Sequence, residues 1–360
     1  MESTVQINED KPDLLSMDRQ EIAAFLKTLG EASYRAGQLF GWLQKGASLE
    51  EMSNLPKSLR EKLGEVSTIS LPIIRRKLVS KIDGTVKYLY ELNDGQCIES
   101  VLMRYEHGNT VCVSSQAGCR MGCTFCASHR SGFVRCLSPG EMLGQVIMTA
   151  RDTGERVDNI VLMGIGEPLD NYDNVLKFLR LASDAEGLCI GARHISLSTC
   201  GIVPKIDQLA KEELQITLSV SLHAATDEKR DQIMPINRKW KIHELLGACR
   251  RYFEATGRRI SFEYALIDSV NDNLAEADAL ASLLRRELGK MPIHVNLIPV
   301  NEVKESGYKK SSRERVDAFA ERLGRRGIIA TVRRKLGSDI NASCGQLRLN
   351  EQNREIVAEN

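Results

Sequence analysis

The sequence predicts an α/β protein in which a small helical domain and an antiparallel β extension precede a partial (βα)6 barrel. Three patterns lead to this prediction. Apolar residues recur at helical spacing up to about residue 66, β-branched and polar residues alternate between about 68 and 117, and short apolar runs alternate with amphipathic stretches beyond residue 138. Regular alternation of strand and helix indicates βαβ units, and such units build a parallel sheet.

The N-terminal region, residues 1–66, is expected to be helical. Ile22, Leu26 and Leu29 follow one another at helical spacing, so they share one face, and Ser16 and Pro56 are suitable residues for helix starts. The next stretch, residues 67–110, is expected to form the antiparallel extension. Segments such as VKYLYEL and CIESVLMR are rich in β-branched and aromatic residues, and Asp-Gly pairs at 83–84 and 94–95 supply tight turns between them.

Residues 111–348 are expected to form the barrel, and residues 349–360 a tail. The expected strands are NIVLMG, HISLST, ITLSVSL, ISFEYALI, IHVNLIP and IIATVR, and the expected helices cover about 139–152, 171–185, 202–212, 241–256, 272–288 and 312–325. In such sheets the chemistry is found at the carboxyl ends of the strands. Polar residues that follow these strands are therefore the first candidates for a functional site.

Composition excludes several classes of protein. The chain has 360 residues, with 49 Lys plus Arg against 48 Asp plus Glu and a formal net charge of +1. It contains no run of about 18 apolar residues, so a membrane-spanning helix is not expected, and its acidic N-terminus lacks the layout of a signal peptide. We therefore expect a soluble cytoplasmic protein whose ten cysteines are core residues, metal ligands or catalytic thiols rather than a disulfide framework.

Three cysteines stand out by their spacing. Cys119, Cys123 and Cys126 lie in CRMGCTFC, soon after TVCVSSQ, which is expected to form a continuous strand over residues 110–116. Three thiolates on one short loop can bind three irons of a four-iron cluster and leave the fourth iron open. A zinc site is the alternative, because His129 follows at a spacing that would complete a Cys3His set. Structural zinc usually organises a small module, whereas a βα barrel follows here, so we expect iron.

Polar residues follow several expected strands. The turn GIGEP, with Glu167, comes after NIVLM; Ser198 ends HISLS; Ser221 and His223 end ITLSVSLH; and Asn301 closes HVNLIPVN. One polar strand end is unremarkable, but four around one barrel rim outline a cofactor cleft.

The sequence also resembles a known family. The runs CVSSQAGC, CTFC, MGIGEPL, LSTCG, SVSLHA, VNLIPVN and NASCGQL, in this order and spacing, are similar to those of the RlmN family of dual-specificity RNA methyltransferases, radical S-adenosylmethionine (SAM) enzymes that methylate C2 of adenosine. The resemblance covers about residues 15–348 and includes the helical domain, which in that family resembles a helix-hairpin-helix RNA-binding unit. A Cfr-like methyltransferase acting on C8 of the same adenine shares these motifs and stays open as an alternative. A second open alternative, from another class of function, is a zinc-stabilised RNA-binding protein without catalysis.

The resemblance implies roles for the matching positions. The [4Fe–4S] cluster would be held by Cys119, Cys123 and Cys126, S-adenosylmethionine by Gly166, Glu167, Ser198, Ser221, Leu222, His223 and Asn301, and catalysis would use the methyl-carrying Cys344, the resolving thiol Cys112 and the acid–base carboxylate Glu99. From the residues alone, Cys112 reads as an inward-facing strand cysteine and Glu99 as a solvated strand carboxylate. No role is assigned to His129 or Cys136.

The resemblance further implies the reaction and its partners. Two molecules of S-adenosylmethionine serve each turnover: one methylates Cys344, and the other yields the radical that lets this methyl carbon attack C2. The RNA is then tethered to Cys344 until Cys112 attacks the sulfur, which leaves a disulfide. The expected partners are 23S rRNA, tRNA beside it and a flavodoxin-like electron donor, for a monomer with no membrane contact. RNA also needs a positive surface on the protein. Residues 301–335 contain eleven Lys or Arg against five Asp or Glu. This basic segment, together with Arg75, Arg76 and Lys77, is the expected phosphate-facing surface.

Overall fold

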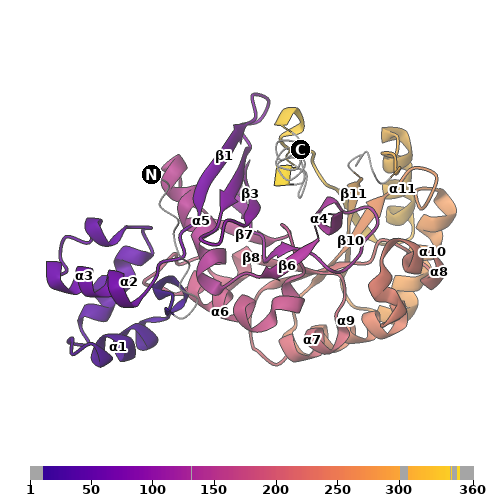
Figure 1. The fold of residues 1–360 in the computed structure, drawn as a ribbon. Helices are drawn as coiled ribbons and strands as arrows, with labels where there is room; N and C mark the ends of the chain where they lie inside the picture. The colour runs from indigo at the N-terminus through magenta and orange to yellow at the C-terminus, as the bar shows by residue number, and fades with distance from the viewer. Residues whose placement is uncertain (1–10, 131, 301–306, 341, 343–346, 349–360) are drawn as a thin grey trace.

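The structure, a computed structural model, describes residues 11–130, 132–300, 307–340, 342 and 347–348. Among these residues the strands form one ten-stranded mixed sheet and one small two-stranded sheet (Figure 1). The α/β class and the partial barrel with its helical and antiparallel additions are therefore confirmed.

Four strands make the antiparallel part of the large sheet: β1 (Ile73–Val79), β2 (Val86–Glu91), β3 (Cys97–Tyr105) and β4 (Gly108–Cys112). Each pairs antiparallel with the next. The predicted turns lie between them, and Gly84 and Gly95 there have φ of 72° and 78°, which favours glycine. On its other side β4 pairs in parallel with β7 (Asn159–Leu162), so β4 joins the antiparallel extension to the barrel.

The parallel part continues from β7 in chain order. Its further strands are β8 (Ile195–Thr199), β9 (Thr217–Ser221), β10 (Ile260–Leu266), β11 (Ile293–Pro299) and β12 (Ile329–Val332). The helices that alternate with them are α5 (Pro139–Thr153), α6 (Tyr172–Ser183), α7 (Val203–Leu209), α9 (Ile242–Thr256), α10 (Leu274–Leu288) and α11 (Arg313–Arg325). Neighbouring strands that all run in parallel bring their carboxyl ends to one edge of the sheet.

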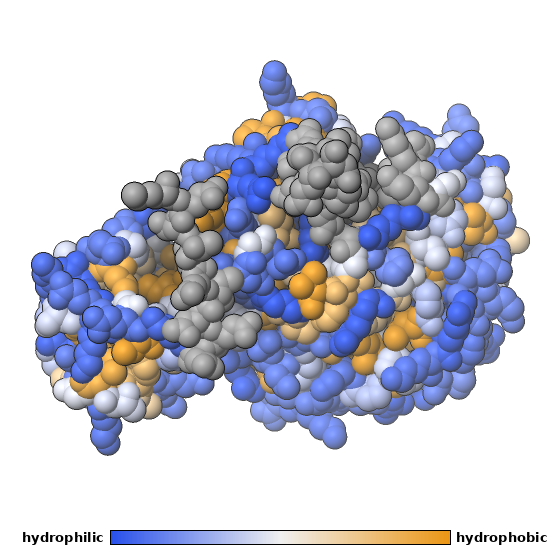
Figure 2. Space-filling view, viewed as in Figure 1, coloured by the Kyte–Doolittle hydropathy of each residue, from blue (hydrophilic) through white to orange (hydrophobic). Residues whose placement is uncertain are grey.

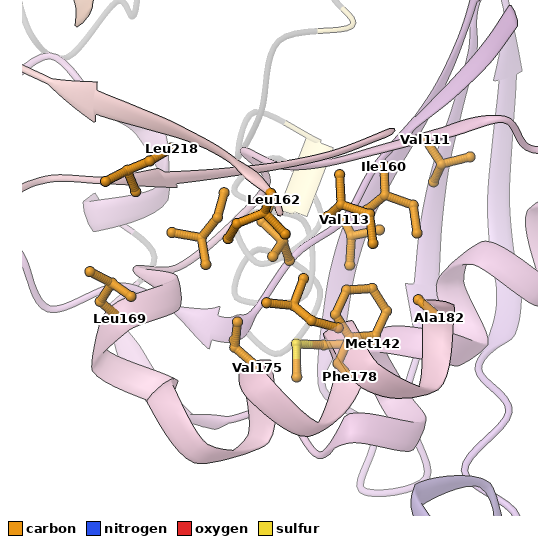
Figure 3. Close-up of a cluster of buried hydrophobic side chains, with 14 of the residues drawn as sticks. Val111, Val113, Met142, Ile160, Leu162, Leu169, Val175, Phe178, Ala182 and Leu218 are labelled. Carbon is orange, nitrogen blue, oxygen red and sulfur yellow. The ribbon is translucent and has the colours of Figure 1, made fainter. Parts of the chain in front are cut away.

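Apolar side chains fill the space between the sheet and its helices. Figure 3 shows Ile160 and Leu162 of β7 facing Met142 of α5 and Phe178 of α6, and all four are fully buried. Burying side chains of this size stabilises the fold by about 1.5–3 kcal/mol each before the entropy cost. This packing fixes β7, and with it the loop that leaves its carboxyl end.

The N-terminal residues form a helical lobe beside α5 and α6 (Figure 1). It comprises the short helices η1 (Leu14–Ser16) and η2 (Leu49–Glu51) and the helices α1 (Arg19–Thr28), α2 (Arg35–Leu43) and α3 (Lys57–Val66). Asp18 begins α1 with a capping box that it shares with Glu21. Leu14 and Leu15 are buried in the same apolar cluster as the barrel helices, so the lobe packs against the barrel.

Four elements differ from the sequence-based expectation. They are α4 (Ala127–Arg130), α8 (Asp227–Ile233) and the strands β5 (Gln116–Gly118) and β6 (Phe133–Cys136), which pair with each other. The expected continuous strand over 110–116 is split, because the chain leaves the large sheet after Cys112. In α8 only Arg230 and Ile233 are buried, so this helix has no apolar periodicity to reveal it.

No helix in the described ranges is long and apolar enough to cross a membrane. Figure 2 shows hydrophilic residues over most of one face of the molecule. Some large apolar side chains are exposed, among them Ile73 and Val79 of β1 and Ile82 in the turn that follows. β1 is an edge strand of the described sheet, so its apolar residues meet solvent.

Candidate active site

A pocket lies at the carboxyl ends of β7 to β10, and we call it the strand-end pocket. It brings together eight residues that the sequence pointed to: Cys119, Cys123, Cys126, Gly166, Glu167, Ser198, Ser221 and His223. The strands β7, β8, β9 and β10 are neighbours in this order, so residues far apart in the sequence meet at their ends. The structure therefore brings most of the predicted site residues together around one pocket.

The three cysteines lie on the loop between β5 and α4, and one long-range and one local backbone hydrogen bond hold this loop. The N–H of Thr124 donates to the carbonyl of Ile233 (3.0 Å), and that of Cys126 to the carbonyl of Cys123 (3.1 Å). Burial, with a further contribution from Cys126, raises the pKa of Cys119 to about 12, and burial with both other thiols raises that of Cys123. Thiols in such surroundings ionise when a positive metal centre binds them, so this donor set fits an iron–sulfur cluster.

The zinc alternative can be tested on the same loop. In the described ranges, no three His, Cys, Asp or Glu side chains converge closely enough to hold one metal ion. A zinc site needs all four donors within about 2.0–2.3 Å of a single ion, whereas a cluster is bound by thiolates on different irons. His129 is exposed and does not line the pocket with the three cysteines. This spacing favours the cluster over a Cys3His zinc site.

The loop GIGEP after β7 is held by the segment that follows β4. Ser114 Oγ accepts a hydrogen bond from the N–H of Ile165 (2.9 Å), and Gln116 Oε1 accepts one from the N–H of Glu167 (2.9 Å). Gly166 has a φ of 112° and lies so close that an added Cβ would be 2.7 Å from Ser115 Oγ. Only glycine avoids both the strain and the clash, so the motif CVSSQAGC positions the motif MGIGEPL.

Glu167 is a buried carboxylate on the wall of the strand-end pocket. Its Oε1 accepts from the N–H of Leu169 (3.0 Å) and its Oε2 from the N–H of Cys200 (2.7 Å). Burial raises its pKa, and these bonds oppose the shift. No Lys or Arg of the described chain forms an ion pair with it. A buried carboxylate that lacks a cation suits the ammonium group of a methionine moiety.

His223 also lines the strand-end pocket and is neutral. Its Nδ1 accepts a hydrogen bond from the N–H of Ala265 (2.9 Å), so the ring proton is on Nε2. Burial and the nearby Arg230 lower its pKa to about 3. Its ring meets Phe125 edge-on, with the ring centres 4.9 Å apart. The imidazole can therefore donate one hydrogen bond in the pocket but carries no charge there near neutral pH.

A second pocket contains Cys112, and we call it the Cys112 pocket. Val101, Met103 and Cys112 form an apolar wall, and Lys310, Arg334 and Lys335 add positive charge to the lining. The two pockets adjoin, because Met163, Ile298 and Arg333 line both. Cys112 is 3% exposed, so it is the inward-facing strand cysteine that the residues alone predict, and it also faces a pocket.

Glu99 is not the solvated carboxylate that its strand context suggests. It is 2% exposed, and its Oε2 lies 2.9 Å from Lys87 Nζ. Its Oε1 accepts a hydrogen bond from the N–H of Arg348 (2.7 Å). Val101 is paired with both Lys87 and Cys112 across the sheet, so Lys87, Glu99 and Cys112 share one face.

Other predicted residues are placed differently or not at all. The Leu222 side chain is fully buried in the apolar core and does not line the strand-end pocket. Its N–H donates to the carbonyl of Glu263 (3.0 Å), a residue that does. Asn301 and Cys344 lie outside the described residues. Of the cations expected to face phosphates, Arg75 is paired with Glu91 and Lys77 with Asp152.

The sequence reasoning missed several residues of the site, which are Gln116, Thr199, Cys200, Glu263 and Arg333. Gln116 has the clearest signal, because it directly precedes the cysteine loop. Glu263 is buried within the apolar strand β10, where a lone carboxylate is unusual. The motif LSTCG contains both Thr199 and Cys200. Nothing in the local sequence distinguishes Arg333 from its basic neighbours.

Two family models match the chain, and together they span most of it. The model "Radical SAM superfamily" matches residues 113–281, which contain the cysteine loop and most of the residues that line the strand-end pocket. The model "Ribosomal RNA large subunit methyltransferase N-terminal domain" matches residues 12–69, which contain the helical lobe.

Similar proteins agree over nearly the full length. A protein of Clostridium botulinum named "Probable dual-specificity RNA methyltransferase RlmN" is 53% identical, covering 93% of this chain and 96% of its own. A protein of Alkaliphilus oremlandii with the same name is 52% identical, covering 94% and 98%. A crystal structure of a radical SAM methyltransferase from Sphaerobacter thermophilus superposes with a TM-score of 0.89 at 44% identity, covering 93% and 98%. With a radical SAM cysteine loop, a matching helical lobe and relatives this close, the chain belongs to the RlmN family of radical SAM RNA methyltransferases.

Proposed function

We propose that this protein methylates C2 of adenosine in 23S rRNA and in tRNA, through a methylated Cys344 and a covalent RNA–enzyme intermediate. The observation that carries this proposal is that the Cys112 pocket adjoins the strand-end pocket. Cys112 therefore lies next to the proposed cofactor site, as a reaction that uses two thiols and S-adenosylmethionine requires. The names of the relatives support C2 over C8, since those proteins are called RlmN.

The residues of the strand-end pocket bind the cofactors in this proposal. Cys119, Cys123 and Cys126 hold a [4Fe–4S] cluster, and Glu167 binds the ammonium group of S-adenosylmethionine. Gly166, Ser198, Ser221, His223, Asn301 and the backbone of Leu222 complete the cofactor site. When bound, these cofactors supply the methyl group and the radical chemistry that C2 of adenine, a poor nucleophile, requires. Two molecules of S-adenosylmethionine are used per turnover.

The residues of the Cys112 pocket act on the RNA in this proposal. Cys344 carries the methyl carbon that bonds to C2, and Glu99 accepts the proton that C2 then loses. The thiolate of Cys112 attacks the Cys344 sulfur, whose bond to the methylene carbon breaks with its electrons going to that carbon, which then takes up a proton to become the methyl group of the product. A disulfide between Cys112 and Cys344 results and is reduced before the next turnover. The cations Lys310, Arg334 and Lys335 face RNA phosphates, and a flavodoxin-like protein supplies electrons to the monomeric enzyme.

The proposal is tested by the product. RNA lacking this modification is incubated with the anaerobically purified enzyme, S-adenosylmethionine and a reductant, and its adenosines are separated by mass spectrometry. We expect 2-methyladenosine from both 23S rRNA and tRNA. 8-Methyladenosine would instead assign a Cfr-like activity, and colourless, zinc-containing protein without product would assign the non-catalytic alternative.

A further inference from the structure

Arg230 of α8 is fully buried and joins the ends of two strands beside the strand-end pocket. Its guanidinium donates to the carbonyls of Cys200 (2.7 Å), Ser221 (2.9 Å) and Leu222 (3.0 Å). A fourth bond goes to Oδ1 of Asn237 (3.0 Å). Cys200 directly follows β8, Ser221 ends β9 and Leu222 follows it, so one side chain fixes two of the strand ends that form the pocket.

The charge of this guanidinium has no direct partner of opposite sign. The four acceptors are three carbonyls and an amide oxygen, and no carboxylate of the described residues forms an ion pair with Arg230. Asp227 and Asp231 are reached only through Asn237, whose Nδ2 donates to both (3.0 and 2.7 Å). Burying an unpaired charge is costly, so buried charges in proteins are normally compensated.

The cysteine loop packs beside Arg230. Cys200, whose carbonyl accepts from the guanidinium, lies in one apolar cluster with Cys123, and both residues line the strand-end pocket. The loop itself is fastened to α8, since the N–H of Thr124 donates to the carbonyl of Ile233 (3.0 Å). An iron–sulfur cluster with three thiolate ligands is anionic, and nearby charge and burial set the potential of such clusters. A fixed cation beside it stabilises the more negative, reduced state.

We propose that Arg230 is a positioning residue whose buried positive charge compensates the cluster on the cysteine loop and raises its reduction potential. The proposal rests on the proposed ligands Cys119, Cys123 and Cys126. It explains why an arginine without a carboxylate partner is buried here, and it adds a function to the hydrogen bonds that hold β8 and β9. One side chain thereby both compensates the charge of the cluster and holds the ends of β8 and β9.

Two substitutions separate the charge of Arg230 from its hydrogen bonds. Arg230→Gln removes the charge but keeps a donor, and Arg230→Lys keeps the charge but loses the planar fork. Arg258→Gln is the matched control. Arg258 also donates to a backbone carbonyl, that of Ile216 (3.3 Å), but Ile216 directly precedes β9, at the end opposite to Ser221. If the Gln protein does not fold, Arg230→Met removes the charge without burying a polar group.

The measurement is the midpoint potential of the cluster, taken from an anaerobic redox titration followed by electron paramagnetic resonance, together with iron content. We expect a more negative potential in the neutral variants, and values near that of the unchanged protein for Arg230→Lys and Arg258→Gln. Loss of the cluster from the neutral variants alone would also support compensation. Neutral variants with full iron content and an unchanged potential would overturn the proposal, as would a Lys variant that behaves like the Gln variant.

The same titration distinguishes this inference from the proposed function. If the unchanged protein contains no iron–sulfur cluster, the ligand assignment fails and with it the proposed function. If the unchanged protein contains the cluster but the variants match it, only the role of Arg230 fails.

Discussion

Lys87 Nζ lies 2.9 Å from Glu99 Oε2, and both side chains are 1% exposed. The other carboxylate oxygen of Glu99 accepts a hydrogen bond from the N–H of Arg348, which lies four residues beyond Cys344. Glu99 therefore connects β2 to the segment that carries the proposed methyl-bearing cysteine. Removing one partner of a buried pair costs about 3–5 kcal/mol, because it leaves a charge uncompensated.

Lys87→Met is expected to lower the free energy of unfolding by about 3–5 kcal/mol, because it leaves the buried carboxylate of Glu99 without the ammonium group 2.9 Å away. Urea unfolding at neutral pH measures the loss.

Lys77→Met is the matched control, since Lys77 lies on the neighbouring edge strand β1 and its ion pair with Asp152 of α5 (2.6 Å) is partly exposed to solvent. It should cost at most about 1 kcal/mol. Equal losses of stability in the two variants would contradict a larger contribution from the buried Lys87–Glu99 pair.

Replacing Cys119, Cys123 or Cys126 by Ala is expected to abolish both the cluster and product formation. Each thiolate binds its own iron, and the loop offers no spare ligand. Iron content and the brown absorbance at about 400 nm measure the loss of the cluster. Cys136→Ala is the control, because Cys136 lies close to the loop, with its Sγ 3.5 Å from Gln116 Nε2. Retained iron and activity in any one loop variant would contradict the ligand assignment.

Glu167→Gln is expected to weaken binding of S-adenosylmethionine about 10- to 100-fold, the range for losing a hydrogen bond to a charged group. The amide keeps the shape but cannot compensate an ammonium ion. Equilibrium dialysis on the cluster-loaded protein gives the affinity. Glu141→Gln is the control, since Glu141 is also buried but pairs with Arg135 (2.7 Å), away from the pocket. Equal affinity in the Glu167 variant and the unchanged protein would place the ammonium group elsewhere.

The sequence predicted the strands and helices of the barrel closely because they carry periodic apolar residues. β11 (Ile293–Pro299), for example, coincides with the expected IHVNLIP. α8 was missed for the opposite reason: the segment DEKRDQI looks solvated, and its buried Arg230 is explained only by carbonyls from two distant strand ends. The strand context of Glu99 predicts an exposed carboxylate, and this prediction is wrong, because strand pairing and not the local sequence brings Lys87 to it. Such contacts depend on tertiary structure and leave no local signal.

His223 is expected to make the protein less stable in acid. Its pKa is lowered to about 3 in the folded protein against about 6.5 when unfolded, so below pH 6.5 the unfolded chain binds a proton that the folded one does not. The free energy of unfolding contributed by His223 is therefore complete above pH 6.5 and falls with decreasing pH, by up to about 2 kcal/mol between pH 7 and 5. His223→Asn should remove this pH-dependent contribution to stability. Asparagine is the suitable replacement, since it tolerates the φ of 57°. Urea unfolding at both pH values gives the comparison, and parallel losses in both proteins would contradict the assignment.

Cys112 is where a structural and a catalytic role lead to the most different outcomes. If it is only a core residue, Cys112→Ala removes one small buried group and costs at most about 2 kcal/mol of stability. Activity would then follow the folded fraction. Cys249→Ala is the matched control, because Cys249 of α9 is fully buried in the core and lines neither of the two pockets.

If Cys112 instead resolves the intermediate, Cys112→Ala should complete each step up to the bond between the methyl carbon and C2 and then stop. No other thiol is assigned to displace the RNA from Cys344, so the variant should purify from cells with RNA covalently attached. Denaturing gels before and after nuclease treatment reveal the attachment as a band that shifts. The attachment should disappear in the double variant with Cys344→Ala, because the methyl carrier is then missing, and it should be absent from Cys249→Ala. RNA-free Cys112→Ala protein with near-normal turnover would return Cys112 to the core and remove the resolving step from the proposed mechanism.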